Sequence, residues 1–218
     1  MSINDSRSGG VRLDLFANPE FDRGASRLTE FVWLVVSGLL VDSWLPGSGW
    51  RCALLRCFGA RIGIGVVIKP RVRVKFPWRL DVGDHTWIGE GVWIDNLALV
   101  RLGSHVCVSQ GAYLCTGSHD WSAPGFDLIT RPIVAADGAW IGARATIGPG
   151  VTVGDGAVLT LSSIATRDLE PWGVYAGSPL KRTGRRRIRT FDGHVACPNP
   201  GAIDEHENPQ MARMDSAA

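Results

Sequence analysis

An apolar residue recurs at every sixth position through most of this chain, and the repeat restricts the possible folds more than any other feature. A helix would need apolar residues about every 3.6 positions and a strand every second position, so neither explains it. A parallel β-helix does, because each six-residue unit supplies one short strand and one turn. The leading apolar residues are Ile62, Ile68, Val74, Val82, Ile88, Ile94, Leu102, Val108, Leu114, Ala135, Ile141, Ile147, Val153, Leu159 and Ala165.

Three such units close one triangular coil with the leading side chains inside. Glycine often follows the leading residue, and it takes backbone angles that other residues resist. One coil cannot bury its own inner face, so successive coils must stack at about 4.8 Å and pair their backbones. The sequence therefore predicts an all-β solenoid of about five coils. The period does not determine the hand, although parallel crossovers are usually right-handed.

Composition divides the chain into four regions. Residues 1–26 are polar, residues 27–59 are apolar and helical in character, and residues 60–180 form the repeat domain. A loop at 120–134 interrupts the repeat, and such an insertion in a solenoid is where binding or chemistry is usually added. Residues 181–218 form a tail, basic at first and then polar and predicted to be disordered.

The apolar region 27–59 has two compatible roles, and both remain open. Terminal repeats must be covered, which predicts a cap on the first coil. Alternatively, the region lies on the cytoplasmic face of the inner membrane, with tryptophans at headgroup level and arginines nearby. A spanning helix needs about 20 apolar residues, and the uncharged run within this region, residues 31–41, is too short. The side chains concerned are Trp33, Trp44, Arg27, Arg51 and Arg56.

The five cysteines are odd in number and form no CxxC pair, which fits a reducing cytoplasm better than a disulfide framework. The N-terminus lacks the apolar core of a secretory signal. We therefore expect a cytoplasmic protein. The formal net charge of +2 says little about partners, and we expect no nucleic-acid partner.

One histidine stands apart from the others. His85 and His105 occupy the fourth place of their hexapeptides, where other units have glycine, so they are expected to be turn residues. His119 ends a coil immediately before the long loop. An imidazole with a pKa near 6.5 can accept a proton from an alcohol at neutral pH. Position alone leaves two roles open for His119, a catalytic base and an anchor for the loop.

Several motifs surround this histidine. They are Cys115-Thr-Gly-Ser-His-Asp-Trp121, the segment 132–155 with its Trp140-Ile-Gly142, and Tyr175-Ala-Gly-Ser-Pro179. These resemble the hexapeptide-repeat O-acetyltransferases, and residues 87–96 and 109–121 resemble the colanic acid biosynthesis acetyltransferases among them. The resemblance covers about residues 27–184. It implies a left-handed β-helix, a homotrimer with active sites between subunits, and acetyl-CoA as cosubstrate. The implied acceptor is a sugar or lipid-linked glycan of exopolysaccharide biosynthesis.

The resemblance also implies roles for individual residues. His119 matches the general base, and the main-chain N–H of Ala143 matches the donor that stabilises the thioester oxyanion. Arg167 and Lys181 match basic positions for the CoA phosphates. Trp140 either lines the pantetheine channel or packs against the neighbouring subunit.

The expected cofactor groove contains one departure from the family. Relatives have a glycine-rich stretch where this chain has Leu159-Thr-Leu-Ser-Ser163, and the resemblance implies a main-chain cofactor contact at Leu161. Four polar residues are candidates for binding the acceptor. They are Glu90, Asp95, Asn96 and Asp120, and Asp120 alternatively orients the imidazole of His119.

Two other functions compete with acetyl transfer. Trimeric hexapeptide β-helices also include zinc lyases, in which three histidines bind a metal between subunits. His85 and His105 should stack one coil apart, but no third ligand is evident, and we expect no metal. A non-catalytic scaffold is the other alternative, supported only by the altered segment 159–163.

Overall fold

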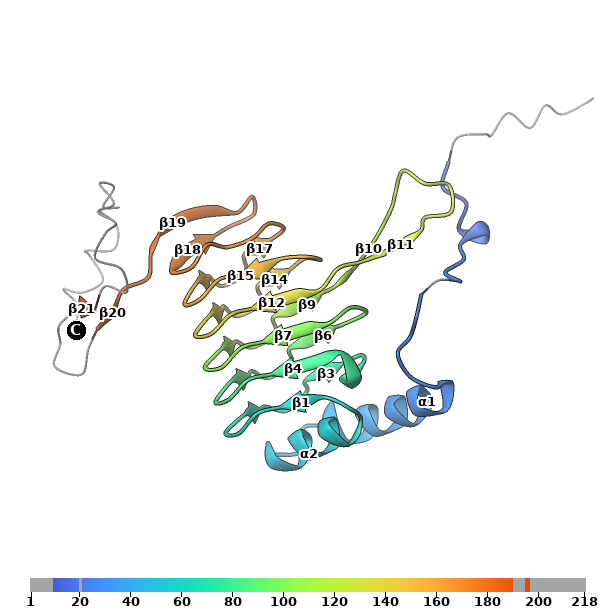
Figure 1. Cartoon of the computed structure of the whole chain (residues 1–218), viewed down its shortest axis with the longest axis horizontal. Helices are drawn as coiled ribbons and strands as arrows, with labels where there is room; N and C mark the ends of the chain where they lie inside the picture. The colour runs from blue at the N-terminus through green and yellow to red at the C-terminus, as the bar shows by residue number, and fades with distance from the viewer. Residues whose placement is uncertain (1–9, 20, 190–194, 197–218) are drawn as a thin grey trace, which may run out of the picture.

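The computed structural model describes residues 10–19, 21–189 and 195–196. Its main body is a left-handed parallel β-helix of five complete coils and part of a sixth (Figure 1). Each coil contributes one strand to each of three sheets, so neighbouring strands within a sheet come from successive coils. The predicted solenoid is confirmed.

The three sheets have the following strands. The first sheet contains β1 (Arg61–Ile62), β4 (Leu80–Val82), β7 (Val100–Leu102), β12 (Ile133–Ala135) and β15 (Thr152–Val153). The second contains β2 (Val67–Ile68), β5 (Trp87–Ile88), β8 (Cys107–Val108), β13 (Trp140–Ile141), β16 (Val158–Leu159), β18 (Gly173–Ala176) and the antiparallel β19 (Lys181–Arg185). The third contains β3 (Arg73–Val74), β6 (Trp93–Asp95), β9 (Tyr113–Cys115), β14 (Thr146–Ile147) and β17 (Ile164–Ala165).

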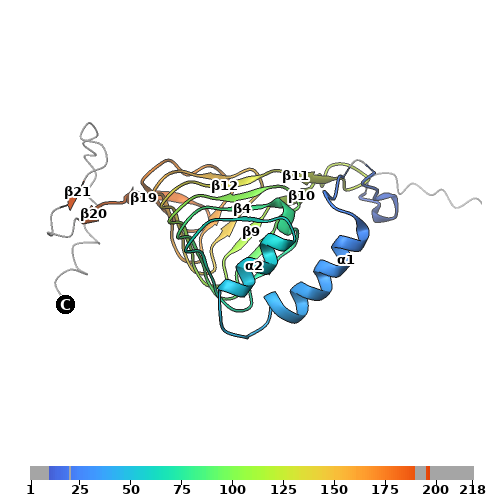
Figure 2. The same ribbon diagram turned by 60° about the horizontal axis from the view of Figure 1, so that its bottom comes forward.

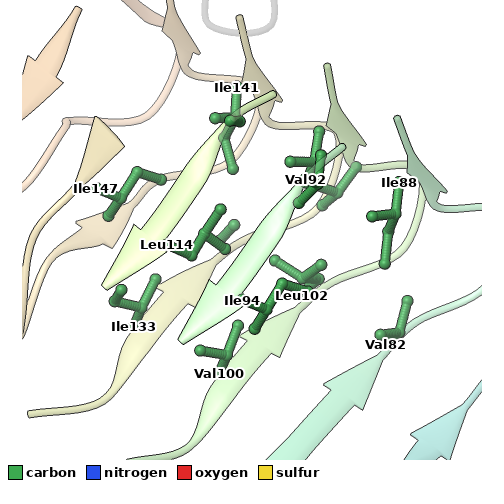
Figure 3. Close-up of a cluster of buried hydrophobic side chains, with 14 of the residues drawn as sticks. Val82, Ile88, Val92, Ile94, Val100, Leu102, Leu114, Ile133, Ile141 and Ile147 are labelled. Atoms are coloured by element: carbon green, nitrogen blue, oxygen red, sulfur yellow. The ribbon is translucent and has the colours of Figure 1, made fainter. Parts of the chain in front are cut away.

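The leading apolar residues of the hexapeptides form the core (Figure 3). All of them are buried except Ile62, which is half-buried and packs against the others. The strand register places the leading residues of successive coils next to each other, for example Ile88 beside Val108 and Val108 beside Ile141. Each coil therefore buries its inner face against the next, as the period requires.

The fourth residue of a hexapeptide lies in a turn, and the backbone conformation of that turn explains why glycine is common there. His85 and His105 have φ of 55° and 56°, a left-handed conformation that most residues avoid, and their rings stack with centroids 5.2 Å apart. Both are turn residues, as predicted. Ser162 adopts the same conformation, with φ of 54°, and Leu161 points into solvent. The altered segment therefore keeps the repeat, since β16 pairs with β13 and β18 in regular order.

Two helices lie at the first-coil end of the solenoid (Figures 1 and 2). They are α1 (Arg27–Val36), which continues into the π-helical turn η2 (Ser37–Val41), and α2 (Gly49–Cys57). Trp33 and Leu55 are buried in the same core as the coils, as expected for a cap. In the described part of the chain, no helix is long and apolar enough to cross a bilayer.

Arg51 corrects one expectation about this region. Its side chain is fully buried rather than available to a lipid headgroup. The guanidinium donates to the main-chain carbonyls of Val41, Ser43, Leu45 and Gly47 at 2.6–3.1 Å. Burial lowers the pKa of Arg51, and the four carbonyl dipoles stabilise the guanidinium charge. Arg51 therefore holds the connection between η2 and α2 in place.

The remaining elements are short. They are η1 (Leu13–Leu15), η3 (Pro77–Arg79), the hairpin of β10 (Gly117–His119) and β11 (Leu128–Thr130), and the pair β20 (Ile188–Arg189) and β21 (Val195–Ala196). Residues 181–185 were predicted to begin a tail, but they form β19 on the edge of the second sheet. Disorder was predicted for residues 190–218, and apart from 195–196 these residues lie outside the described part of the chain.

Candidate active site

The interruption of the repeat is a β-hairpin that projects from one corner of the solenoid (Figure 1). β10 and β11 pair antiparallel, with Gly117 opposite Thr130 and His119 opposite Leu128. The hairpin begins three residues before the predicted loop, because its backbone pairing is independent of the hexapeptide period. His119 is the last residue of β10, so a regular strand fixes its backbone while its ring faces the hairpin loop.

The ring of His119 is held by Phe126. Its Nδ1 lies 2.8 Å from the Phe126 carbonyl oxygen, and the two rings stack with centroids 4.3 Å apart and planes 7° from parallel. A carbonyl oxygen can only accept, so Nδ1 must carry the proton in this hydrogen bond. In the neutral imidazole, Nε2 then keeps its lone pair. This is the tautomer that a general base at Nε2 needs.

A segment near the N-terminus lies against the same hairpin. Arg12 donates its main-chain N–H to the Pro124 carbonyl at 2.8 Å, and the Phe16 ring lies 5.6 Å from the His119 ring. Sequence analysis missed both Phe16 and Phe126. Neither belongs to a hexapeptide, and no periodic signal connects a loop residue to a segment about a hundred positions earlier in the chain.

Asp120 does not orient the imidazole. Its carboxylate accepts from the hydroxyl of Ser122 at 2.5 Å and from the main-chain N–H of Ser122 at 2.9 Å. These bonds, the side-chain one first, lower the pKa of Asp120. The Phe126 carbonyl has the orienting position instead, so only the predicted acceptor contact of Asp120 stays open.

Ala143 lies at another corner of the solenoid. It belongs to the turn that precedes β14, whereas His119 follows β9, and β9 and β14 are parallel neighbours in the third sheet. The two residues therefore lie at opposite ends of that sheet. Within one chain, the structure does not bring the predicted base and the predicted oxyanion donor together.

The main-chain N–H of Ala143 is nevertheless available to a ligand. It has no hydrogen-bond partner among the described residues, although the Ala143 carbonyl accepts from Ser162 at 2.8 Å. The turns at the neighbouring corner differ, because there aspartate carboxylates accept hydrogen bonds from the corresponding main-chain N–H groups. Asp84 accepts from Ile64 and Asp137 from Ser104, both at 2.8 Å.

The residues predicted to bind the cofactor fall at two places. Trp140 is exposed on the outer face of the second sheet, where its indole N–H donates to the Ser109 hydroxyl at 2.9 Å. Leu161 is exposed in the turn stacked on that of Ala143. Arg167 donates to the carbonyl of Leu180 at 2.9 Å, which places it beside Lys181. The Arg167 guanidinium therefore lies against the main chain next to Lys181.

The predicted acceptor residues include one error. Asn96 is fully buried, and its amide is saturated by the main chain of Phe76 and Arg79. It cannot contact a sugar, and its role is to join two successive corners of the solenoid. Glu90 is exposed in a turn and lies 3.9 Å from Arg71.

Asp95 lies in a partly buried polar group. Its Oδ1 is buried without a hydrogen bond of good geometry, but it lies 3.1 Å from the Lys75 ammonium, so the two form an ion pair. Its Oδ2 accepts from the Tyr113 hydroxyl at 3.2 Å. Burial first, and then the neighbouring Cys115 and Asp95, raise the pKa of Tyr113. Asp95 is thus already engaged by Lys75 and Tyr113.

No cluster of three or more His, Cys, Asp or Glu side chains suited to a metal occurs in the described ranges. His85 and His105 stack on each other. A lyase-type site would need a third ligand beside this pair.

Comparisons with known proteins agree with this architecture. No family model matches the chain. A protein of Escherichia coli K12 named "Putative colanic acid biosynthesis acetyltransferase WcaF" is 37% identical over 177 residues, covering 80% of this chain and 96% of that protein. Nodulation protein L of Rhizobium meliloti is 30% identical over 173 residues, covering 77% and 91%.

A solved structure shows the same fold. The hexapeptide-repeat acetyltransferase VCA0836 of Vibrio cholerae, complexed with acetyl-CoA, superposes with a TM-score of 0.69 at 26% identity, covering 79% of this chain and 96% of that one. The extent of the match to the E. coli protein, over nearly its whole length, establishes the family. This chain belongs to the colanic acid biosynthesis acetyltransferases, a branch of the hexapeptide-repeat acetyltransferases.

Proposed function

We propose that this protein transfers the acetyl group of acetyl-CoA directly to a sugar hydroxyl of an exopolysaccharide precursor in the cytoplasm. The observation that carries the proposal is the hydrogen bond from His119 Nδ1 to the Phe126 carbonyl, because it leaves Nε2 as a base at the tip of a rigid strand. The acetyl donor is supported by the V. cholerae relative solved with acetyl-CoA. The acceptor class is supported by the name of the E. coli relative.

The chemistry follows from these groups. Nε2 of His119 removes the proton from the acceptor hydroxyl as that oxygen attacks the thioester carbonyl carbon. The N–H of Ala143 donates to the oxyanion that develops on the thioester oxygen. The C–S bond then breaks, and the CoA thiolate takes the proton from the imidazolium. No acetyl-enzyme forms in this sequence.

A complete site requires two copies of the chain. His119 and Ala143 occupy different corners of one solenoid, so one protomer would supply the base and its neighbour the oxyanion donor. A cyclic homotrimer repeats this contact at each interface. We assign Arg167 and Lys181 to the CoA phosphates, and Glu90, Asp95 and Asp120 to the region of the acceptor.

The test uses labelled acetyl-CoA and a panel of free, nucleotide-linked and lipid-linked sugars, with products identified by mass spectrometry. His119→Ala should lower kcat by about 10² to 10⁴, the usual contribution of a positioned base, while CoA still raises the melting temperature. His105→Asn is the matched control, because asparagine tolerates the left-handed turn. Undiminished turnover by the His119 variant would remove the general base from the proposal.

A second experiment tests the shared site. His119→Ala is co-expressed with Ala143→Pro, which lacks the main-chain N–H. Mixed oligomers should recover part of the activity, since some interfaces then combine an intact base with an intact donor. If mixtures were as inactive as the separate variants, the two residues would not belong to one shared site.

A further inference from the structure

The outer surface of α1 and η2 is unusually apolar. Leu28, Leu39 and Trp44 are each more than 70% exposed. A surface helix normally turns its polar side outward, and contiguous exposed apolar surface marks a site of contact. We call this set the N-terminal apolar surface, and it consists of Leu28, Phe31, Val32, Leu34, Val35, Leu39, Leu40, Trp44 and Leu45.

The helices and the first coil at this end of the solenoid are together strongly basic. Residues 27–79 contain nine Lys and Arg against two Asp and Glu, whereas the whole chain has a formal net charge of only +2. Some of these cations are paired, as Lys75 is with Asp95 at 3.1 Å, and Arg51 is buried. We define the basic collar as four of the exposed cations at this end, Arg27, Lys69, Arg71 and Arg73, of which Arg71 lies 3.9 Å from Glu90.

A cavity of about 590 Å³ lies between α1 and β3, where the apolar surface meets the collar. It is lined by apolar side chains such as Phe31 and Leu34, together with the cations Arg23, Arg27 and Lys75 and the single acid Glu30. Arg23 forms an ion pair with Glu30 at 2.5 Å, which leaves the lining with a positive balance. This combination suits an anionic group attached to an apolar chain.

We propose that this end of the protein docks on an anionic lipid bilayer, with the N-terminal apolar surface at the acyl boundary and the basic collar among the headgroups. Interfacial segments combine an apolar face, tryptophan and flanking cations in this way. The excess of cations favours a lipid surface over a second copy of the chain, because two copies of the collar would repel each other. Anionic headgroups attract such a surface.

The docking would place the active site close to the membrane. Strands of one sheet lie about 4.8 Å apart, and His119 follows the third coil, so it is roughly 10 Å above the first coil along the solenoid. A sugar carried on a membrane lipid through a phosphate would lie near this height. This step rests on the proposed function, and it makes a lipid-linked glycan the favoured acceptor. In a cyclic trimer, all three docking surfaces would face the same side.

The experiment is co-sedimentation of the full-length protein with vesicles of phosphatidylcholine, with and without phosphatidylglycerol. The wild type should bind the anionic vesicles, and binding should fall as salt is raised. Leu28→Glu combined with Leu39→Glu should lower the partition coefficient by roughly a hundredfold, since two exposed leucines are replaced by charges. Ile188→Glu, which changes a partly exposed residue on β20, beyond the last coil, is the matched control.

Activity measurements separate this proposal from the proposed function. The Leu28/Leu39 variant should acetylate a water-soluble acceptor at the wild-type rate, and His119→Ala should bind vesicles like the wild type. Absence of binding to anionic vesicles would overturn the docking proposal, as would wild-type binding by the Leu28/Leu39 variant. Dissociation of the oligomer in that variant, with vesicle binding intact, would instead assign the surface to an interface between copies.

Discussion

Replacing Asn96 by alanine removes three hydrogen bonds that hold one corner of the solenoid to the next. The Asn96 Oδ1 accepts from the N–H of Phe76 at 2.9 Å, and its Nδ2 donates to the carbonyls of Phe76 and Arg79 at 2.6 and 2.9 Å. Phe76 is buried, so water cannot replace the amide there. An unsatisfied buried polar group costs about 1–3 kcal/mol. We expect the variant to lose about 3 kcal/mol of the free energy of unfolding.

The assay is urea unfolding followed by tryptophan fluorescence, together with acetyl-transfer kinetics under conditions where the variant remains folded. Gln110→Ala is the control, because it removes an exposed amide and should change stability by less than about 0.5 kcal/mol. The KM for the acceptor should not change, since the Asn96 side chain is inaccessible. Wild-type stability together with a raised KM would refute this reasoning and return Asn96 to the acceptor site.

Three further predictions concern other parts of the fold. Gly142→Ala should lower the free energy of unfolding by about 2 kcal/mol and impair turnover, because the new Cβ would lie 2.5 Å from the backbone of the next coil. Gly184→Ala is the control, since nothing lies within 4 Å of its Cβ, and it should be neutral in thermal unfolding and activity assays. Arg51→Met should lower the free energy of unfolding by about 3 kcal/mol, because it removes four hydrogen bonds to main-chain carbonyls. An unchanged urea midpoint would argue against a role of Arg51 in holding the connection between η2 and α2. Burial raises the pKa of the Cys52 thiol, so less of this thiol is thiolate at neutral pH. Iodoacetamide should therefore modify the exposed Cys57 first, as measured by peptide mass spectrometry. Equal labelling of both cysteines would indicate that α2 opens readily.

Most of the solenoid was predictable because its folding rule is local. The hexapeptide period specifies which residue of each unit points inward, and residues as different as Ala135 and Leu159 obey it. The same period predicted that His85 and His105 are turn residues. It even survives the non-glycine segment around Leu161, since Ser162 adopts the left-handed turn at an energetic cost that the neighbouring coils offset.

The candidate site was only partly predictable. His119 was identifiable because the repeat breaks immediately after it. Phe126 was not, since the backbone of an irregular loop places its carbonyl 2.8 Å from Nδ1 and no sequence period describes that loop. Phe16 contacts the same ring from a segment about a hundred residues away along the chain.

The sequence by itself thus determined the architecture, because apolar side chains spaced six residues apart are buried by stacking triangular coils, although this spacing does not determine the hand. Only the tertiary structure decided which polar groups face solvent and which lie inside. Asn96 and Arg51 have the side chains of surface residues, yet both are buried, because main-chain groups from other turns converge on them and satisfy their hydrogen bonds. The tautomer of His119 has the same kind of origin, since a single carbonyl, placed by the fold of the hairpin, determines which ring nitrogen is free to act as a base.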